Sequence, residues 1–189
     1  MSRATEHSHE EARPWVVLIG PPGSGKSTLG AELARRSGGQ LWDTDVAIEA
    51  AQGRSISDVF VEDGEASFRE MERLEVIRAL SEHRDVLALG GGAVMTADVA
   101  RALGHPRHRG TVVFLDVGIA DAASRVGFDV SRPLLVVNPR ASWNRLMNAR
   151  RSTYEELADV HVDTAGRGVE EIADEIERLV PSPLTGQEG

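Results

Sequence analysis

Short apolar segments alternate with longer segments of helical periodicity along most of the chain. Five of the short segments have the length and composition of β-strands, namely Trp15–Ile19, Gln40–Trp42, Val86–Leu89, Thr111–Leu115 and His161–Val162. Parallel strands need long crossover connections, which are usually helical, whereas antiparallel strands can be joined by tight turns. The alternation therefore predicts an α/β fold of three layers, in which helices cover both faces of a central, parallel, five-stranded sheet.

Helical periodicity is clearest in two segments. In the first, which begins near Ser67, apolar residues recur every three positions and predict a stripe that faces the core: Phe68, Met71, Leu74, Ile77 and Leu80. The second has its apolar side at Val169, Ile172, Ile176 and Leu179, and its acidic side is expected to face solvent. Further helices are expected from Lys26 to Arg36, from near Thr96, and from Ser142 to Arg151.

The two ends of the chain differ from the segment between them. Residues 1–13 are polar, and residues 181–189 are rich in Pro, Ser and Gly, so neither end can bury much surface. The chain has 189 residues and 41% apolar content, which suffices for one hydrophobic core. We expect one domain, residues 14–180, between two flexible tails.

Charge and composition narrow the range of partners. The formal net charge is −9 and no basic run is present, so a nucleic-acid partner is not expected. No apolar run approaches the roughly 18 residues of a membrane span, and a signal-peptide core is absent. Cysteine is also absent, which suits a reducing compartment. The expectation is a cytoplasmic monomer that binds neither nucleic acid nor membrane.

A glycine-rich loop follows the first predicted strand. The run Gly20-Pro21-Pro22-Gly23-Ser24-Gly25-Lys26-Ser27-Thr28 completes the pattern G-x-x-x-x-G-K-[ST]. Its glycines keep side chains out of the way, so that backbone N–H groups and the start of the next helix can surround phosphates. Lys26 supplies charge for the β- and γ-phosphates, and the Ser27 hydroxyl can ligate Mg²⁺. The alternative, a glycine-rich turn with a chance lysine, is disfavoured by the strand before the loop and the helix after it.

Two carboxylates, Asp43 and Asp45, follow the second predicted strand. In an extended segment their side chains would point the same way. One could organise the Mg²⁺ shell, while the other faces an acceptor substrate and takes or orients a hydroxyl proton. The alternative is an N-cap pair that starts a helix at Val46.

Further candidates are an arginine and a triplet of glycines. Arg69 could present two parallel donors to a substrate carboxylate, or could simply pair with Glu72 or Glu65. The fourth motif, Gly90-Gly91-Gly92, directly follows a predicted strand. Three glycines in a row indicate close approach of a ligand or another chain segment, with a flexible turn as the alternative.

The last candidates are arginines in the second half of the chain. Arg125 and Arg132 bracket a loop that resembles a mobile lid, about residues 125–140. A lid of this kind can exclude water and neutralise charge on a transferred phosphoryl group. The pair Arg150-Arg151 closes a helical segment, and for Arg151 the favoured interpretation is a contribution to the helix dipole.

Taken in order, these motifs resemble the shikimate kinase family, from about Trp15 to Val180. The resemblance rests on the phosphate loop, Asp43 to Glu49, Gly64 to Glu72, the glycine triplet and Arg132-Pro133-Leu134-Leu135. It implies a P-loop kinase fold that transfers the γ-phosphoryl group of ATP to the 3-hydroxyl of shikimate, with Mg²⁺, in the biosynthesis of chorismate and the aromatic amino acids.

The resemblance also implies roles for individual residues. On the nucleotide side, Gly23, Ser24, Gly25, Lys26, Ser27 and Thr28 bind phosphates, Asp43 supports the metal ion, Arg132 reaches the phosphates, and Arg125 and Arg167 lie near the adenine. On the acceptor side, Asp45 binds hydroxyls and is the proton acceptor, Arg69 and Arg150 bind the carboxylate, and Gly90, Gly91 and Gly92 contact the ring substituents. Lys26, Asp45 and Arg132 are the catalytic candidates.

This chain departs from the family pattern after Arg150, where a proline usually follows by two positions. Here the sequence is Arg150-Arg151-Ser152-Thr153-Tyr154, and the spacing to Tyr154 favours Arg150 over Arg151. Rival interpretations are a P-loop kinase for another acceptor, such as gluconate or a nucleoside monophosphate, and a nucleotide-dependent switch. A kinase for another acceptor such as gluconate would keep the loop and the lid but would not need the joint set of Asp45, Arg69 and the glycine triplet. In a pure switch the charges on the acceptor side would have no use.

Overall fold

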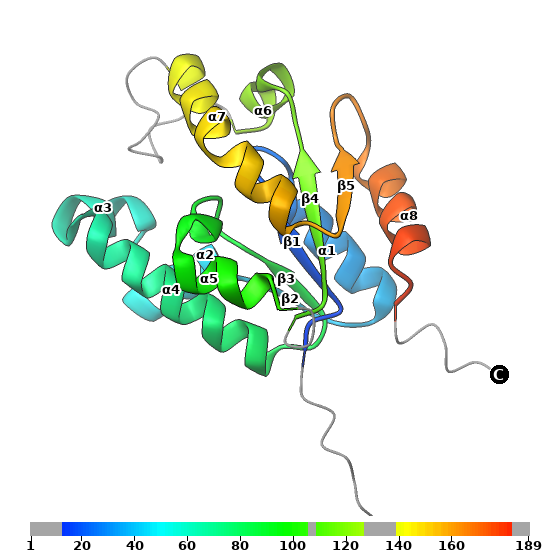
Figure 1. The fold of residues 1–189 in the computed structure, drawn as a ribbon, viewed down its shortest axis with the longest axis horizontal. Helices are drawn as coiled ribbons and strands as arrows, with labels where there is room; N and C mark the ends of the chain where they lie inside the picture. The colour runs from blue at the N-terminus through cyan, green and yellow to red at the C-terminus, as the bar shows by residue number, and fades with distance from the viewer. Residues whose placement is uncertain (1–12, 106–108, 127–138, 183–189) are drawn as a thin grey trace, which may run out of the picture.

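The computed structural model describes residues 13–105, 109–126 and 139–182. Its centre is a parallel sheet with the strand order β2-β3-β1-β4-β5 (Figure 1). The strands are β1 Val16–Ile19, β2 Leu41–Asp43, β3 Val86–Ala88, β4 Thr111–Asp116 and β5 Val160–Asp163. All four pairings in the sheet are parallel. The predicted five-stranded parallel sheet is confirmed, and each strand lies within two residues of its predicted bounds.

Helices cover both faces of this sheet. They are α1 Lys26–Ser37, α2 Thr44–Gln52, α3 Ile56–Glu62, α4 Gly64–Glu82, α5 Ala97–Leu103, α6 Ile119–Val126, α7 Pro139–Leu157 and α8 Val169–Leu179, with a 3₁₀ turn, η1, at Ala93–Met95. Figure 1 shows α4, α5 and α7 on one side of the sheet and α1 and α8 on the other. The three layers predicted from the alternating pattern are therefore present.

Strand β1 explains why the sheet has two cores. Val16 and Leu18 point to one face and pack with residues of α1 and α8. Val17 and Ile19 point to the opposite face and pack with residues of α4, α5 and α7. All four side chains are buried, as expected for a central strand covered by helices on both faces.

A smaller cluster lies beyond β2. Ile48 of α2, Val59 of α3 and Phe68 of α4 pack together apart from the two main cores. In Figure 1 α3 lies at the left, away from the sheet, next to the first turns of α4. This arrangement places the start of α4, with Arg69, close to α2, with Asp45.

The predicted apolar stripe of α4 is wrong in its middle part. Leu74 is 54% exposed and Ile77 is 37% exposed, whereas Phe68 and Leu80 are buried. A step of three residues turns an α-helix by about 300°, so residues repeated every three positions drift around the helix instead of sharing one face. The buried residues of α4 instead include Glu72.

Two helices differ from their predicted bounds. Helix α4 begins at Gly64, three residues before Ser67, and α7 extends in both directions beyond Ser142–Arg151. Helix α5 begins after Thr96, as expected. Residues 1–12, most of the predicted lid including Arg132, and residues 183–189 lie outside the described residues. Within the described parts, no helix combines the length and apolar character needed to cross a bilayer.

Candidate active site

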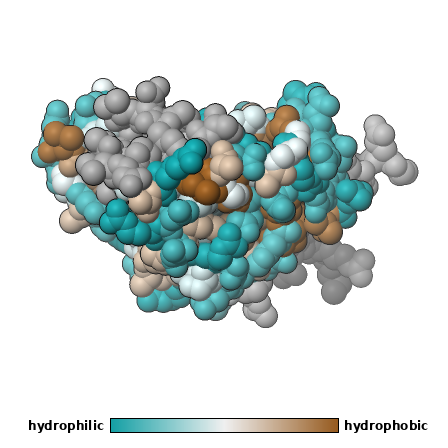
Figure 2. Space-filling model, turned by 90° about the horizontal axis from the view of Figure 1, so that it is seen from above, coloured by the Kyte–Doolittle hydropathy of each residue, from teal (hydrophilic) through white to brown (hydrophobic). Residues whose placement is uncertain are grey.

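The carboxyl ends of three strands meet at one edge of the sheet. The phosphate loop follows β1, Asp43 ends β2, and the glycine triplet begins just after β3. In open parallel sheets, ligands bind in the crevice outside these ends. Figure 2 looks onto this end of the molecule, where hydrophilic residues predominate around a few separate hydrophobic ones.

The phosphate loop needs its glycines for two different reasons. Gly25 has φ +89 and is the N-cap of α1, a backbone conformation that L side chains rarely adopt. At Gly20 a Cβ would lie 2.6 Å from the carbonyl oxygen of Leu115. Lys26 Nζ donates to the carbonyl oxygens of Gly20 at 2.9 Å and Pro21 at 3.1 Å. The loop is therefore folded around its own lysine.

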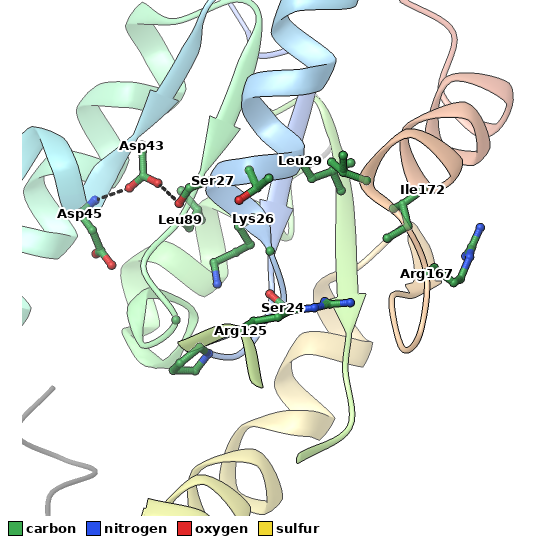
Figure 3. Close-up of a pocket in the computed structure, with 16 residues that line it drawn as sticks. Ser24, Lys26, Ser27, Leu29, Asp43, Asp45, Leu89, Arg125, Arg167 and Ile172 are labelled. Atoms are coloured by element: carbon green, nitrogen blue, oxygen red, sulfur yellow. Dashed lines mark hydrogen bonds between the residues drawn. The ribbon is translucent and has the colours of Figure 1, made fainter. Parts of the chain in front are cut away.

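A pocket of about 650 Å³ opens at this loop (Figure 3). Residues 22–28 line it, together with Asp43, Asp45, Gly91, Arg125 and Arg167 and the apolar side chains of Leu29, Leu89, Val169 and Ile172. In Figure 3 the two carboxylates lie on one side of Lys26, and the two arginines lie on the other. The sequence motifs thus contribute to a single pocket with a carboxylate side and an arginine side.

Asp43 connects the loop with the second strand. Its Oδ2 accepts a hydrogen bond of 2.6 Å from Ser27 Oγ. Its Oδ1 accepts from the backbone N–H groups of Asp45 at 3.0 Å and Val46 at 3.3 Å, which makes Asp43 the N-cap of α2. The expectation that Asp43 and Asp45 point the same way from one extended segment is wrong, because Asp45 already lies in the first turn of α2.

The oxygens of Ser27 and Asp43 fit a magnesium ion. Mg²⁺ prefers oxygen ligands and is commonly held by one or two carboxylates together with substrate phosphates and water. The described residues contain no cluster of three or more His, Cys, Asp or Glu side chains that could hold a metal by themselves. A hydroxyl beside a single carboxylate, next to a phosphate loop, is the donor set that such a shared site requires.

The glycine triplet lies where side chains from three elements converge. A Cβ at Gly90 would collide with Asp45 Oδ1 and would lie 2.6 Å from Glu72 Oε1. A Cβ at Gly92 would collide with the guanidinium of Arg69 and would lie 2.7 Å from its Cζ. Close approach, rather than a need for a flexible turn, therefore accounts for glycine at both positions.

Arg69 is held from several directions. Its Nη1 donates to Glu72 Oε2 at 2.7 Å, and its Nη2 donates to Glu65 Oε1 at 3.3 Å. Its Cζ lies 5.3 Å from the centroid of the Phe68 ring, within the range of a cation–π contact. The ion pairs considered from the sequence are both present, and they fix the guanidinium beside Gly92.

Glu72 belongs to the site, although the sequence pattern identifies it only as a possible partner of Arg69. It is only 1% exposed, and burial raises the pKa of its carboxyl while the Arg69 guanidinium opposes that rise. A nearly buried glutamate is rare unless it is paired. The available signal was a charged residue one turn after Phe68, on the buried side of the helix.

Helix α7 distinguishes the two adjacent arginines. Arg150 Nη1 and Tyr154 Oη donate to the carbonyl oxygen of Gly91, at 2.9 Å and 2.5 Å. Arg151 instead donates two hydrogen bonds of 2.7 Å to the carboxylate of Asp116, at the end of β4. The helix-dipole interpretation of Arg151 is wrong, because α7 continues to Leu157. Of these two arginines, Arg150 is the one that donates to the glycine triplet.

The remaining arginines border the other side of the pocket. Arg125 donates to the side chain of Thr164 at 3.0 Å and to its carbonyl oxygen at 2.6 Å. Arg167 pairs with Glu171 at 2.7 Å and with Glu175 at 2.6 Å. Both arginines line the pocket, and their position near the adenine stays a prediction.

Comparison with known proteins identifies the family to which this chain belongs. A family model described as shikimate kinase matches residues 22–180. This chain belongs to the shikimate kinase family. The shikimate kinase of Streptomyces avermitilis is 50% identical over 160 residues, which cover 85% of this chain and 91% of that protein. The recognition and the enzyme class predicted from the sequence are confirmed.

Solved structures agree. The shikimate kinase from Acinetobacter baumannii, solved in complex with shikimate, matches with a TM-score of 0.84 and 32% identity, covering 95% of this chain and 97% of that one. A gluconokinase from Sinorhizobium meliloti matches with a TM-score of 0.50 and 20% identity, covering 90% of this chain and 94% of that one. The first match confirms the predicted P-loop kinase fold, and the second shows a shared fold alone.

Proposed function

We propose that this protein transfers the γ-phosphoryl group of ATP to the 3-hydroxyl of shikimate, giving shikimate 3-phosphate and ADP, a step of chorismate biosynthesis. The observation that carries the proposal is the position of Asp45. This carboxylate lines the pocket at the phosphate loop. It also lies against Gly90 of the glycine triplet, next to the carboxylate of Glu72. Family membership supports the same reaction.

On the donor side, the loop N–H groups and Lys26 bind the phosphates. Lys26 adds positive charge where negative charge develops on the transferred group. Ser27 and Asp43 would hold Mg²⁺, which supplies charge neutralisation to the phosphates when it is bound. Arg125 and Arg167 border the nucleotide from the opposite side, and we assign Arg132, outside the described residues, to the phosphates.

On the acceptor side, charge fixes the orientation of a small substrate that carries one carboxylate and several hydroxyls. We assign the carboxylate to Arg69 and Arg150, and the ring substituents to the backbone of Gly90, Gly91 and Gly92. Glu72 holds Arg69 in place. Asp45 accepts the proton of the 3-hydroxyl as that oxygen bonds to the γ-phosphorus and the bond to the β-phosphate oxygen breaks.

Other expectations remain predictions. They are the cytoplasmic location, the monomeric state, the requirement for Mg²⁺, the flexible tails and the lid at about residues 125–140.

A coupled assay of ADP release tests the proposal. The protein is supplied with ATP and Mg²⁺, and shikimate, quinate, gluconate and AMP are offered separately. We expect turnover with shikimate, and a decrease in kcat of about 10²- to 10⁴-fold in Asp45→Asn, as for loss of a general base. The matched control is Asp98→Asn, whose carboxylate is 47% exposed and pairs with Arg101. Turnover with another acceptor and none with shikimate would refute the proposal.

A further inference from the structure

Helix α7 contacts two loops of the candidate active site. One of these contacts is made by a residue that belongs to none of the sequence motifs described above. The contact to the glycine triplet is made by Arg150 and Tyr154. The other joins the indole Nε1 of Trp143 to the carbonyl oxygen of Pro22, in the phosphate loop, at 3.0 Å. These two residues are 121 positions apart in the sequence.

The hydrogen bond of Trp143 is buried. Trp143 is 4% exposed and belongs to the core cluster that also contains Met147 and Phe114. Pro22 is buried as well. A carbonyl oxygen that loses its donor in such surroundings cannot readily regain one from water, so the bond has a strong directional effect on the loop.

Successive carbonyl groups of the phosphate loop each have a side-chain donor. Lys26 donates to the carbonyl oxygens of Gly20 and Pro21, and Trp143 donates to that of Pro22. Each bond fixes the orientation of one peptide plane. Two of these planes are held by the lysine of the motif, and the third depends on a residue of α7.

The third plane includes the N–H of Gly23. In a trans peptide unit the C=O and N–H groups point in opposite directions, and no cis peptide bond occurs among the described residues. The Pro22 carbonyl points to α7, so the Gly23 N–H points away from α7. Gly23 lines the pocket, where backbone N–H groups are the expected ligands of phosphate.

We propose that Trp143 is a positioning residue for the nucleotide: its indole N–H orients the Pro22–Gly23 peptide so that the Gly23 N–H faces the phosphates. The inference rests on the proposed function for the identity of the nucleotide, and it adds a residue that the phosphate-loop motif does not contain. Trp143 contacts the loop and is not among the residues that line the pocket, so its loss weakens nucleotide binding without removing a catalytic group.

The chain provides a matched control. Trp15 Nε1 donates to the carbonyl oxygen of Val180 at 3.1 Å, and this bond is also buried. Trp15 lies just before β1, whereas the pocket lies at the opposite end of that strand. Trp143→Phe and Trp15→Phe therefore remove the same donor from the same kind of acceptor, near the pocket and far from it.

The experiment measures ADP binding by calorimetry, with Mg²⁺, in the full chain and both variants. We expect the dissociation constant of ADP to rise about 5- to 20-fold in Trp143→Phe, and to stay within about twofold in Trp15→Phe. The thermal midpoint is expected to fall in both variants. In steady-state kinetics, Trp143→Phe should raise KM for ATP and leave KM for shikimate within about threefold.

Unchanged ADP affinity in a folded Trp143→Phe variant would overturn the inference, and so would an equal loss of affinity in Trp15→Phe. If Trp143→Phe does not fold, the double variant Trp15→Phe/Trp42→Phe leaves Trp143 as the only one of the three tryptophans. Its emission should then change as ADP is added, and constant emission up to saturation would contradict the coupling. ADP binding needs no acceptor, so failure to phosphorylate shikimate would refute the proposed function alone.

Discussion

The substitution Gly92→Ala tests how closely the acceptor side is packed. Gly92 has φ −102 and ψ −14, a conformation that alanine can adopt, so backbone strain does not contribute. The added Cβ would lie 2.7 Å from Cζ of Arg69 and 2.9 Å from Nη2. Ordinary contacts of a Cβ begin at 3.4 Å, so the guanidinium carbon must withdraw by at least 0.7 Å, from 2.7 to 3.4 Å.

Under the proposed assignment of the substrate carboxylate to Arg69, a shift of this size separates the two groups. A hydrogen bond to a charged group contributes about 1.5–3 kcal/mol, so the loss of one raises KM for shikimate by about 10- to 150-fold. KM for ATP should stay within about twofold, because Arg69 does not line the nucleotide pocket. Both constants are obtained from the coupled ADP-release assay.

The control for Gly92→Ala is Gly118→Ala, because a Cβ at Gly118 meets nothing within 4 Å. Both variants add one methyl group at a glycine that precedes a helical segment. A KM for shikimate within about threefold of the natural chain in Gly92→Ala would refute the assignment of Arg69 to the substrate carboxylate. An equal rise in Gly118→Ala would show that the effect is not local.

Three further predictions concern α7 and two carboxylates. Arg150→Ala should raise KM for shikimate roughly 30- to several-thousand-fold, whereas Arg151→Ala, whose ion pair is partly exposed, should change it less than about fivefold. Burial raises the pKa of Glu72, so its contribution to stability is full below about 4.5 and is lost as pH rises through the raised value. Glu72→Gln should therefore gain stability relative to the natural chain as pH rises above about 4.5, measured by urea unfolding. Asp159 has the opposite sign: burial opposes ionisation, but the hydrogen bond from Arg109 lowers its pKa below 3.8 overall. Asp159→Asn should be less stable than the natural chain at neutral pH. The difference in stability should disappear as pH falls below 3.8, through the lowered pKa of Asp159.

The fold was predictable because its signals are local and repeated. Each strand is a short apolar segment, and each is followed by a helix, so a parallel sheet follows from connectivity alone. The site was predictable for the same reason. Its motifs stand at or just after the ends of β1, β2 and β3, and the carboxyl ends of parallel strands lie at one edge of the sheet. The sequence therefore places the phosphate loop, Asp43 and the glycine triplet together without coordinates.

Residues that act through tertiary contacts were harder to predict. The apolar residues of α4 alone predict Leu74 and Ile77 in the core, and they leave Glu72 as no more than a partner of Arg69. The helix buries Glu72 because it faces the same space as Asp45 and Gly90. A polar residue at a buried helical position is therefore a signal of a functional site that an apolar pattern hides.

The phosphate loop shows the limit of motif reasoning most clearly. Its pattern requires glycines because they allow the chain to turn, but glycines do not determine which way each N–H group points. That direction depends on what the neighbouring carbonyl groups bind, because both groups belong to one rigid peptide plane. Lys26 serves this purpose from within the motif, and Trp143 serves it from α7. The same helix carries Arg150 to the glycine triplet, so the donor and acceptor sides of the site are fixed to one rigid element, and their relative position depends on residues that no local pattern connects.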